Sequence, residues 1–132
     1  MWRGSCRVQG RDSKGMKLTS TILKNIYNML VVCEPFEKWN MPLAAQIRFV
    51  VDADPDVMGT YLYQDDEKWE HIITISTARC GFLDTVIRTM AHEMIHMSFH
   101  RRKGNKWAQH GKEFRSRCFR VGQELGLYPL EL

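Results

Sequence analysis

The sequence predicts a small α+β domain in which one helix precedes a three-stranded antiparallel sheet and two further helices follow it. Apolar residues recur at spacings of three and four near residues 19–33, 83–97 and 110–125, which is typical of helices. Between the first two stretches lie three short runs rich in β-branched and aromatic residues. With 132 residues, the chain is long enough for one hydrophobic core and too short for two full domains.

The first helix is expected to begin at Thr19 or Ser20, since either residue can cap it, and to end before Pro35. Its apolar stripe is expected to contain Ile22, Ile26, Met29, Leu30 and Cys33. Residues 36–46 then form a connection or a short, broken helix.

Three strands are expected over Ile47–Asp52, Gly59–Tyr63 and His71–Ser76. The turn signal Asp54-Pro55-Asp56 separates the first two, and an acidic turn separates the second from the third. Short loops between neighbouring strands favour hairpins, and therefore an antiparallel sheet.

The overall composition indicates an intracellular globular protein. Residues 1–18 are polar and basic without apolar periodicity, so we expect a loose N-terminal arm before a folded domain over residues 19–132. No apolar run has membrane-spanning length, and the first residues lack the apolar core of a secretory signal. The four cysteines form no C-x-x-C pair, which excludes a zinc ribbon and a thioredoxin-type site.

The strongest functional signal is the run His92-Glu93-Met94-Ile95-His96. Residues four apart lie on the same face of a helix, so His92 and His96 can offer two imidazoles to one ion. Glu93 is rotated by about 100° from His92, which places it beside that ion. Two histidines and a glutamate able to take a proton from water form the H-E-x-x-H pattern of zinc hydrolases.

This helix is expected to have two faces, with Asp84 or Thr85 capping its start. The apolar face contains Leu83, Ile87, Met90, Met94 and Met97. The opposite, polar face contains Thr85, Thr89, His92 and His96. A polar stripe also fits the solvated side of an ordinary amphipathic helix, and this alternative needs no metal.

A catalytic zinc normally has three protein ligands, so a third is sought. His100 is excluded because eight residues along a helix span about 12 Å. The longer pattern H-E-x-x-H-x-x-G-x-x-H also fails, because Phe99 and Arg102 occupy its glycine and last histidine positions. The remaining candidates are His110, Glu113 and Glu124.

The last helix is expected to run roughly from His110 to Leu125 and to end at Gly126. It would bury Phe114, Cys118, Val121 and Leu125. His110 lies four residues before Phe114 and would face inward with it, so we favour His110 as the third ligand. The alternative is that His110 faces solvent.

Positive charge is concentrated over residues 101–120, in a chain of net charge +4. Candidate contacts to nucleic-acid phosphates are Arg101, Arg102, Lys103, Lys106, Lys112 and Arg115. Trp107 and Phe119 are available for stacking on bases. The competing interpretation is a solvated basic surface without a partner.

Residues 84–96, followed by His110-Gly111-Lys112-Glu113-Phe114, resemble the SprT-like metalloprotease domain shared by bacterial SprT and the DNA-repair protease Spartan. The resemblance implies a minimal zincin-like fold, Zn²⁺ bound by His92, His96 and His110, and Glu93 as the catalytic base. It implies hydrolysis of peptide bonds in protein substrates. Spartan-type members digest proteins crosslinked to DNA, so the basic segment is expected to contact DNA.

The chain departs from Spartan-type members in lacking a cysteine-based zinc ribbon and a recruitment tail. We therefore expect a monomeric, cytoplasmic protein of bacterial or phage origin without a membrane partner. Tyr61, Tyr63 and His71 are candidates for stabilising the oxyanion, although His71 is also expected at the exposed edge of a strand. Two other function classes stay open: a non-catalytic nucleic-acid-binding module with a structural metal, and a metallohydrolase acting on a non-peptide substrate.

Overall fold

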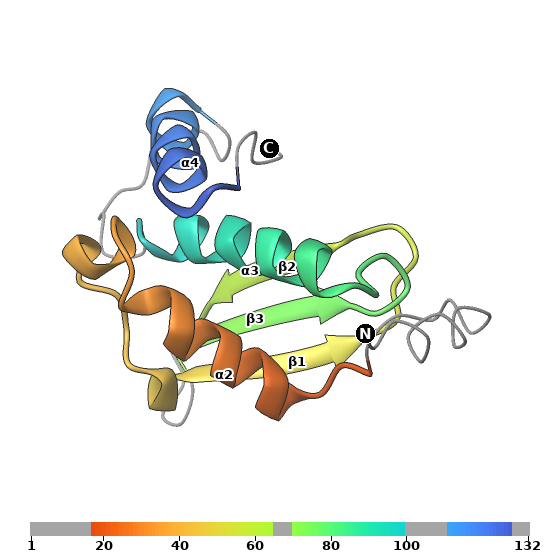
Figure 1. Ribbon diagram of the computed structural model, residues 1–132. Coiled ribbons are helices and arrows are strands. Elements are labelled where there is room, and N and C mark those ends of the chain that lie inside the picture. Colours follow the sequence, from red (N-terminus) through yellow and green to blue (C-terminus); the bar gives the residue numbers. More distant parts are fainter. Residues whose placement is uncertain (1–16, 65–69, 100–110, 128–132) are drawn as a thin grey trace, which may run out of the picture.

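The computed structural model describes residues 17–64, 70–99 and 111–127. Its main elements follow the predicted order, namely α2 (Ser20–Val31), β1 (Ile47–Asp52), β2 (Gly59–Tyr63), β3 (His71–Ser76), α3 (Leu83–Met97) and α4 (Lys112–Leu125). The 3-10 helices η2 (Phe36–Trp39) and η3 (Ala44–Gln46) join α2 to β1, where the sequence predicted a connection or a short, broken helix. In Figure 1, α2 and α3 lie over one face of the sheet, and α4 lies on the far side of α3.

The sheet is mixed, so the prediction of a wholly antiparallel sheet is wrong. The strand order is β1-β3-β2, with β1 parallel to β3 and β2 antiparallel to β3. The predicted hairpin between β2 and β3 is confirmed. The strand β3 takes the centre because four of its six residues are buried, whereas β2 has none that is fully buried and lies at an edge.

Helix α2 begins as predicted, because the Oγ1 of Thr19 accepts a hydrogen bond from the backbone N–H of Ile22 at 3.1 Å. The predicted apolar stripe is partly wrong, because Met29 is exposed. The buried residues are Leu23, Ile26, Tyr27 and Leu30. Tyr27 sets this orientation, since its ring lies 5.7 Å from that of Phe49 and its hydroxyl donates to the carbonyl of Pro42 at 2.6 Å.

The predicted N-terminal arm lies almost wholly outside the described residues, but Leu18, its last residue, is buried with the core. The folded part therefore begins before Thr19. No helix in the described part of the chain is long and apolar enough to span a bilayer.

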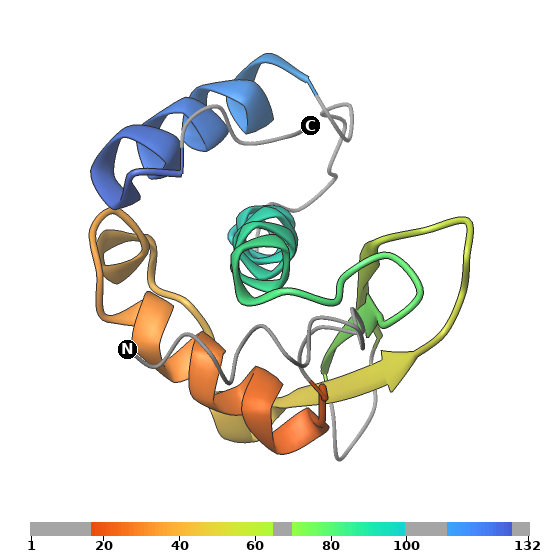
Figure 2. The same ribbon diagram turned by 45° about the vertical axis from the view of Figure 1, so that its right-hand side comes forward.

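Helix α3 lies in the middle of the domain, and Figure 2 looks nearly along it, with the other helices and the sheet arranged around it. The amphipathic alternative is therefore wrong, because Thr89, Glu93 and His96 on its polar face are all buried. Leu83, expected on the apolar face, is exposed at the start of the helix. Phe82 is the N-cap residue without a side-chain hydrogen bond, so the predicted cap by Asp84 or Thr85 is also wrong.

Helix α4 begins at Lys112, two residues later than predicted, and ends at Leu125, followed by the C-cap Gly126 in the left-handed conformation expected there (φ 72°). It buries Phe114, Cys118 and Val121 as predicted. The middle of α4 is held in place by Arg117, whose guanidinium lies 4.3 Å from the ring centres of Trp39 and Phe99. Arg117 also donates to the Oγ of Ser98 at 2.7 Å. Helix α4 is thus tied to η2 and to the end of α3.

Candidate active site

The two histidines of the H-E-x-x-H run lie side by side on α3. The ring centres of His92 and His96 are 4.9 Å apart, with an angle of 71° between the ring planes. This neighbourhood follows from the helix itself, because positions i and i+4 share a face. Two nitrogen donors are therefore held next to each other by a single, buried helix.

Phe114 of α4 packs on both imidazoles. Its ring centre is 4.3 Å from that of His96, nearly parallel at 24°, and 5.2 Å from that of His92. Phe114 was predicted only as a core residue, and its contact with the two histidines was not predicted. A hint lies in the run His110-Gly111-Lys112-Glu113-Phe114, where an aromatic residue follows a histidine by four positions. Packing by Phe114 restricts the rotamers of the two histidines.

Glu93 is buried, with 5% of its surface exposed. Burial raises the pKa of its carboxyl from 4.5 to about 8, because desolvation disfavours the charged form. A cation close by would favour ionisation and lower this pKa again. Glu93 is therefore a group whose protonation depends strongly on what binds beside it, as expected of a general base.

Glu93 and His92 line a cavity of about 480 Å³. One wall consists of the helix residues Thr85, Arg88, Thr89, His92 and Glu93, and the other of residues 56–59, which lead into β2. A cavity that combines a buried carboxyl, an imidazole and apolar surface is the usual form of a binding or catalytic site.

Gly59 brings the two walls of this cavity together. A Cβ atom at this position would lie 2.8 Å from Cγ2 of Thr89 and 3.0 Å from the carbonyl oxygen of Thr74. Only glycine permits β2 to lie this close to α3. Cys80 adds a further link, since its Sγ lies 3.4 Å from Oγ1 of Thr89.

Residues 41–131 match the family model of the SprT-like family. The chain belongs to the SprT-like family. No curated protein and no solved structure matches it. The family is one of metalloprotease-like domains, and the matched region contains the whole sheet, α3 and α4. The match thus includes every residue that the sequence predicted for the site.

The third metal ligand predicted for this SprT-like chain, His110, lies outside the described residues, as does the rejected candidate His100. The prediction that His110 faces inward assumed a helix from about residue 110, whereas α4 begins at Lys112 after the N-cap Gly111. Glu113 and Glu124, the other candidates, are exposed on α4. No three His, Cys, Asp or Glu side chains gather into a metal site within the described ranges.

The candidates for stabilising an oxyanion pair with one another on the helix-facing side of the sheet. The hydroxyl of Tyr61 and the Nδ1 of His71 are 2.8 Å apart, and the ring of Tyr63 is 5.5 Å from that of His71. None of the three lines the cavity beside Glu93. The prediction of an exposed His71 is wrong, because Tyr61 and Tyr63 cover it and 1% of its surface is exposed.

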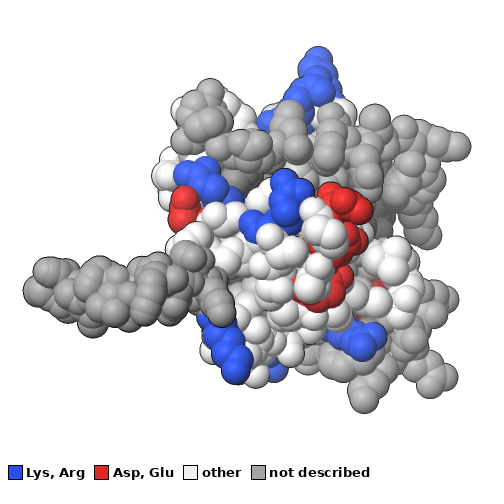
Figure 3. All heavy atoms as spheres, turned by 90° about the vertical axis from the view of Figure 1, so that its right-hand side faces the viewer, with Lys and Arg blue, Asp and Glu red and all other residues white. Residues whose placement is uncertain are grey.

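Charges of both signs surround the cavity of the SprT-like domain. Arg88 is held by Asp84 at 3.1 Å and donates to the carbonyl of Leu127 at 2.7 Å. Asp56, on the opposite wall, is exposed. Figure 3, which views the end of the molecule where β1 ends and α3 begins, shows acidic side chains next to basic ones. The cavity therefore has charged groups on both walls.

The predicted nucleic-acid contacts lie mostly beyond the described residues. Arg101, Arg102, Lys103 and Lys106 fall outside them, and so does Trp107. Lys112, Arg115 and Phe119 are exposed on α4. Arg117, in the same basic segment, is half-buried between two aromatic rings, so this member serves packing.

Proposed function

We propose that this SprT-like chain is a zinc-dependent endopeptidase with Glu93 as its general base. The observation that carries the proposal is the placement of two adjacent imidazoles and a buried carboxyl on one helix, beside a cavity of about 480 Å³. Buried polar residues on a central helix are costly unless they are partnered or functional, which favours a chemical role over a structural one.

The donor set suits zinc, since imidazole nitrogen is among its preferred ligands and i, i+4 histidines are a common zinc-binding pair. His92 and His96 would hold the ion, with His110 as the third ligand by the family pattern. Zinc would supply Lewis acidity, making a nearby water more acidic and polarising the substrate carbonyl. Phe114 holds both rings in place by packing.

Glu93 would move the proton in this reaction. Its carboxylate accepts a proton from the attacking water and delivers it to the nitrogen of the leaving amine. The burial that raises the pKa of Glu93 to about 8 in the metal-free chain also keeps bulk water away from the reacting groups.

The edge of β2 is the natural place for the substrate. This strand pairs with β3 on one side, and residues 56–59 of the cavity wall lead directly into it. An extended polypeptide that adds to β2 would lie along the cavity beside Glu93. The exposed side chains of Thr60, Leu62 and Tyr63 are available for contact.

We also propose that the basic segment contacts DNA and that the substrates are DNA-associated proteins. The exposure of Lys112 and Arg115 on α4 supports this proposal. Charge reversal of Arg101, Arg102, Lys103 and Lys106 is expected to weaken DNA binding and to flatten its dependence on salt. An unchanged salt slope would instead favour a solvated surface.

The deciding experiment combines zinc analysis with cleavage of casein or histone, with and without DNA. We expect about one zinc per chain and cleavage that is lost with the metal, and His96→Ala is expected to lose both. Bound zinc without cleavage of either protein would favour the structural-metal module. Cleavage of DNA in place of protein would favour a metallohydrolase of another specificity.

A further inference from the structure

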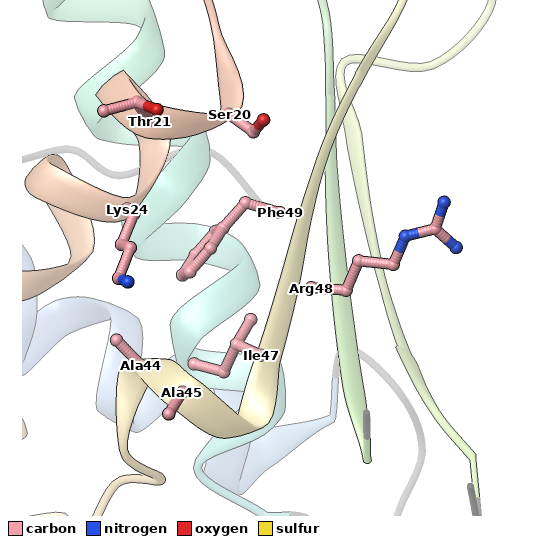
Figure 4. Close-up of a pocket in the computed structure, with 8 residues that line it drawn as sticks. All are labelled: Ser20, Thr21, Lys24, Ala44, Ala45, Ile47, Arg48 and Phe49. Carbon is pink, nitrogen blue, oxygen red and sulfur yellow. The ribbon is translucent and has the colours of Figure 1, made fainter. Parts of the chain in front are cut away.

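A second large cavity runs along the outer edge of β1, and none of its lining residues lines the cavity beside Glu93. Its volume is about 490 Å³. The lining comes from the first turns of α2, from η3 and from β1, namely Ser20, Thr21, Lys24, Ala44, Ala45, Ile47, Arg48 and Phe49. Figure 4 shows these residues, and we call the cavity the β1 groove.

The backbone of β1 is unpaired on the side of this groove, since β1 pairs only with β3 among the described strands. The N–H of Thr77 donates to the carbonyl of Asp52 at 2.8 Å, so the carbonyl of Asp52 faces β3. The backbone N–H and C=O groups of successive strand residues point to opposite edges of the strand. Since those of Asp52 face β3, those of Val51 and Phe49 face the β1 groove. An edge of this kind is a template for strand addition.

The side chains make the β1 groove positive on both faces of the strand. Lys24 reaches from α2 toward η3 on the helix side, while Arg48 points to the opposite face of the sheet (Figure 4). Both side chains are exposed, and neither forms an ion pair with a described residue. No described acidic residue lines the groove, and its floor is apolar through Ala44, Ile47 and Phe49.

We propose that the β1 groove binds an extended acidic segment of a partner protein by strand addition to β1. Successive side chains of an added strand point to opposite faces. Two neighbouring acidic residues would therefore meet Lys24 on one face and Arg48 on the other. A second copy of this chain fits less well, because pairing two β1 edges would bring the same cations together.

The test measures the anisotropy of fluorescein-labelled octapeptides with alternating Thr and Val. One peptide has Asp-Glu at its centre, and its control has Lys-Arg. The Asp-Glu peptide is expected to bind at least about tenfold more tightly at low salt, with a difference that shrinks as salt screens the charges. The double variant Lys24→Glu with Arg48→Glu is expected to reverse the preference, and Arg120→Glu, on exposed α4, to leave it unchanged.

Backbone pairing is tested separately with the Asp-Glu peptide N-methylated along its central residues, which keeps its charges and removes its donors. We expect about a tenfold or larger loss of affinity. Equal binding of the acidic and basic peptides would overturn the proposal, and so would undiminished binding of the N-methylated peptide. Self-association in sedimentation that the double variant abolishes would assign the edge to a second copy and would also overturn it.

Discussion

The two edges of the sheet differ in what lies beside them. Residues 56–59, which line the cavity beside Glu93 and His92, lead into β2. Charges of both signs line this cavity as well. The edge of β1 borders a groove of similar volume whose charged lining, among the described residues, consists of Lys24 and Arg48. In our two proposals, the same three-stranded sheet binds an extended chain at each edge, and the side chains beside the edge decide whether chemistry or only binding follows.

The largest expected effect is the loss of hydrolysis at the proposed site beside β2, while the β1 groove is unaffected. Glu93→Gln preserves the shape of the side chain and removes the base, so hydrolysis of casein should fall by roughly 10²–10⁴-fold. Zinc content and binding of the acidic peptide to the β1 groove should not change. The measurements are initial rates, metal analysis and peptide anisotropy on the same preparation. A fully active Glu93→Gln protein would show that the base has been wrongly assigned.

The next effect concerns the helix that packs on the histidines. Phe114→Ala should lower the free energy of unfolding by about 3–5 kcal/mol, because it leaves a cavity against the two imidazoles. It should also weaken zinc binding, which chelator competition can measure. Phe119→Ala, on the exposed face of the same helix, is the matched control and should stay within about 0.5 kcal/mol of the parent. Equal effects of the two substitutions would contradict the packing role of Phe114.

In metal-free protein, the buried carboxyl should make stability depend on pH. The pKa of Glu93 is raised from 4.5 to about 8 in the folded chain, so the unfolded chain releases its proton first as pH rises. The contribution of Glu93 to the free energy of unfolding should therefore be largest below about pH 4.5, decrease between pH 4.5 and 8, and stay constant above pH 8. The total decrease should be on the order of 5 kcal/mol. Urea titrations of metal-free parent and Glu93→Gln should differ in this slope, and identical slopes would contradict the prediction.

A smaller effect tests the close approach of β2 to α3. Gly59→Ala places a methyl group 2.8 Å from Cγ2 of Thr89 and should cost about 1–3 kcal/mol in unfolding free energy. Because serine lacks Cγ2, the double variant Gly59→Ala with Thr89→Ser should recover part of that loss. Thermal melts of the single and double variants supply the comparison. Simple additivity of the two substitutions would mean that this contact is not the cause.

The bounds of all three strands could be predicted from the sequence, because each is a short run rich in β-branched or aromatic residues near turn-forming residues. Their pairing could not. A short loop between β1 and β2 suggests a hairpin, but the greater burial of β3 places it between them. Local patterns report which residues prefer extended backbone, whereas strand order depends on how much apolar surface each strand must bury.

The candidate site was predicted in part. The i, i+4 spacing sufficed to place His92 next to His96, since the helix alone dictates it. The burial of Thr89 and Glu93 was missed because a polar stripe looks solvated until the neighbouring elements are known. His110 stays a prediction, since it lies outside the described residues.

The guanidinium of Arg117, 4.3 Å from the centre of the Trp39 ring, gives the molecule a built-in optical reporter. Indole emission responds to a charge held against the ring, so a shift of α4 relative to η2 should change the fluorescence of Trp39. The chain has four tryptophans, and replacing Trp2, Trp69 and Trp107 by phenylalanine would leave Trp39 as the sole emitter. The proposed binding of zinc by His92 and His96, which Phe114 of the same helix contacts, would then be followed in real time without any added dye.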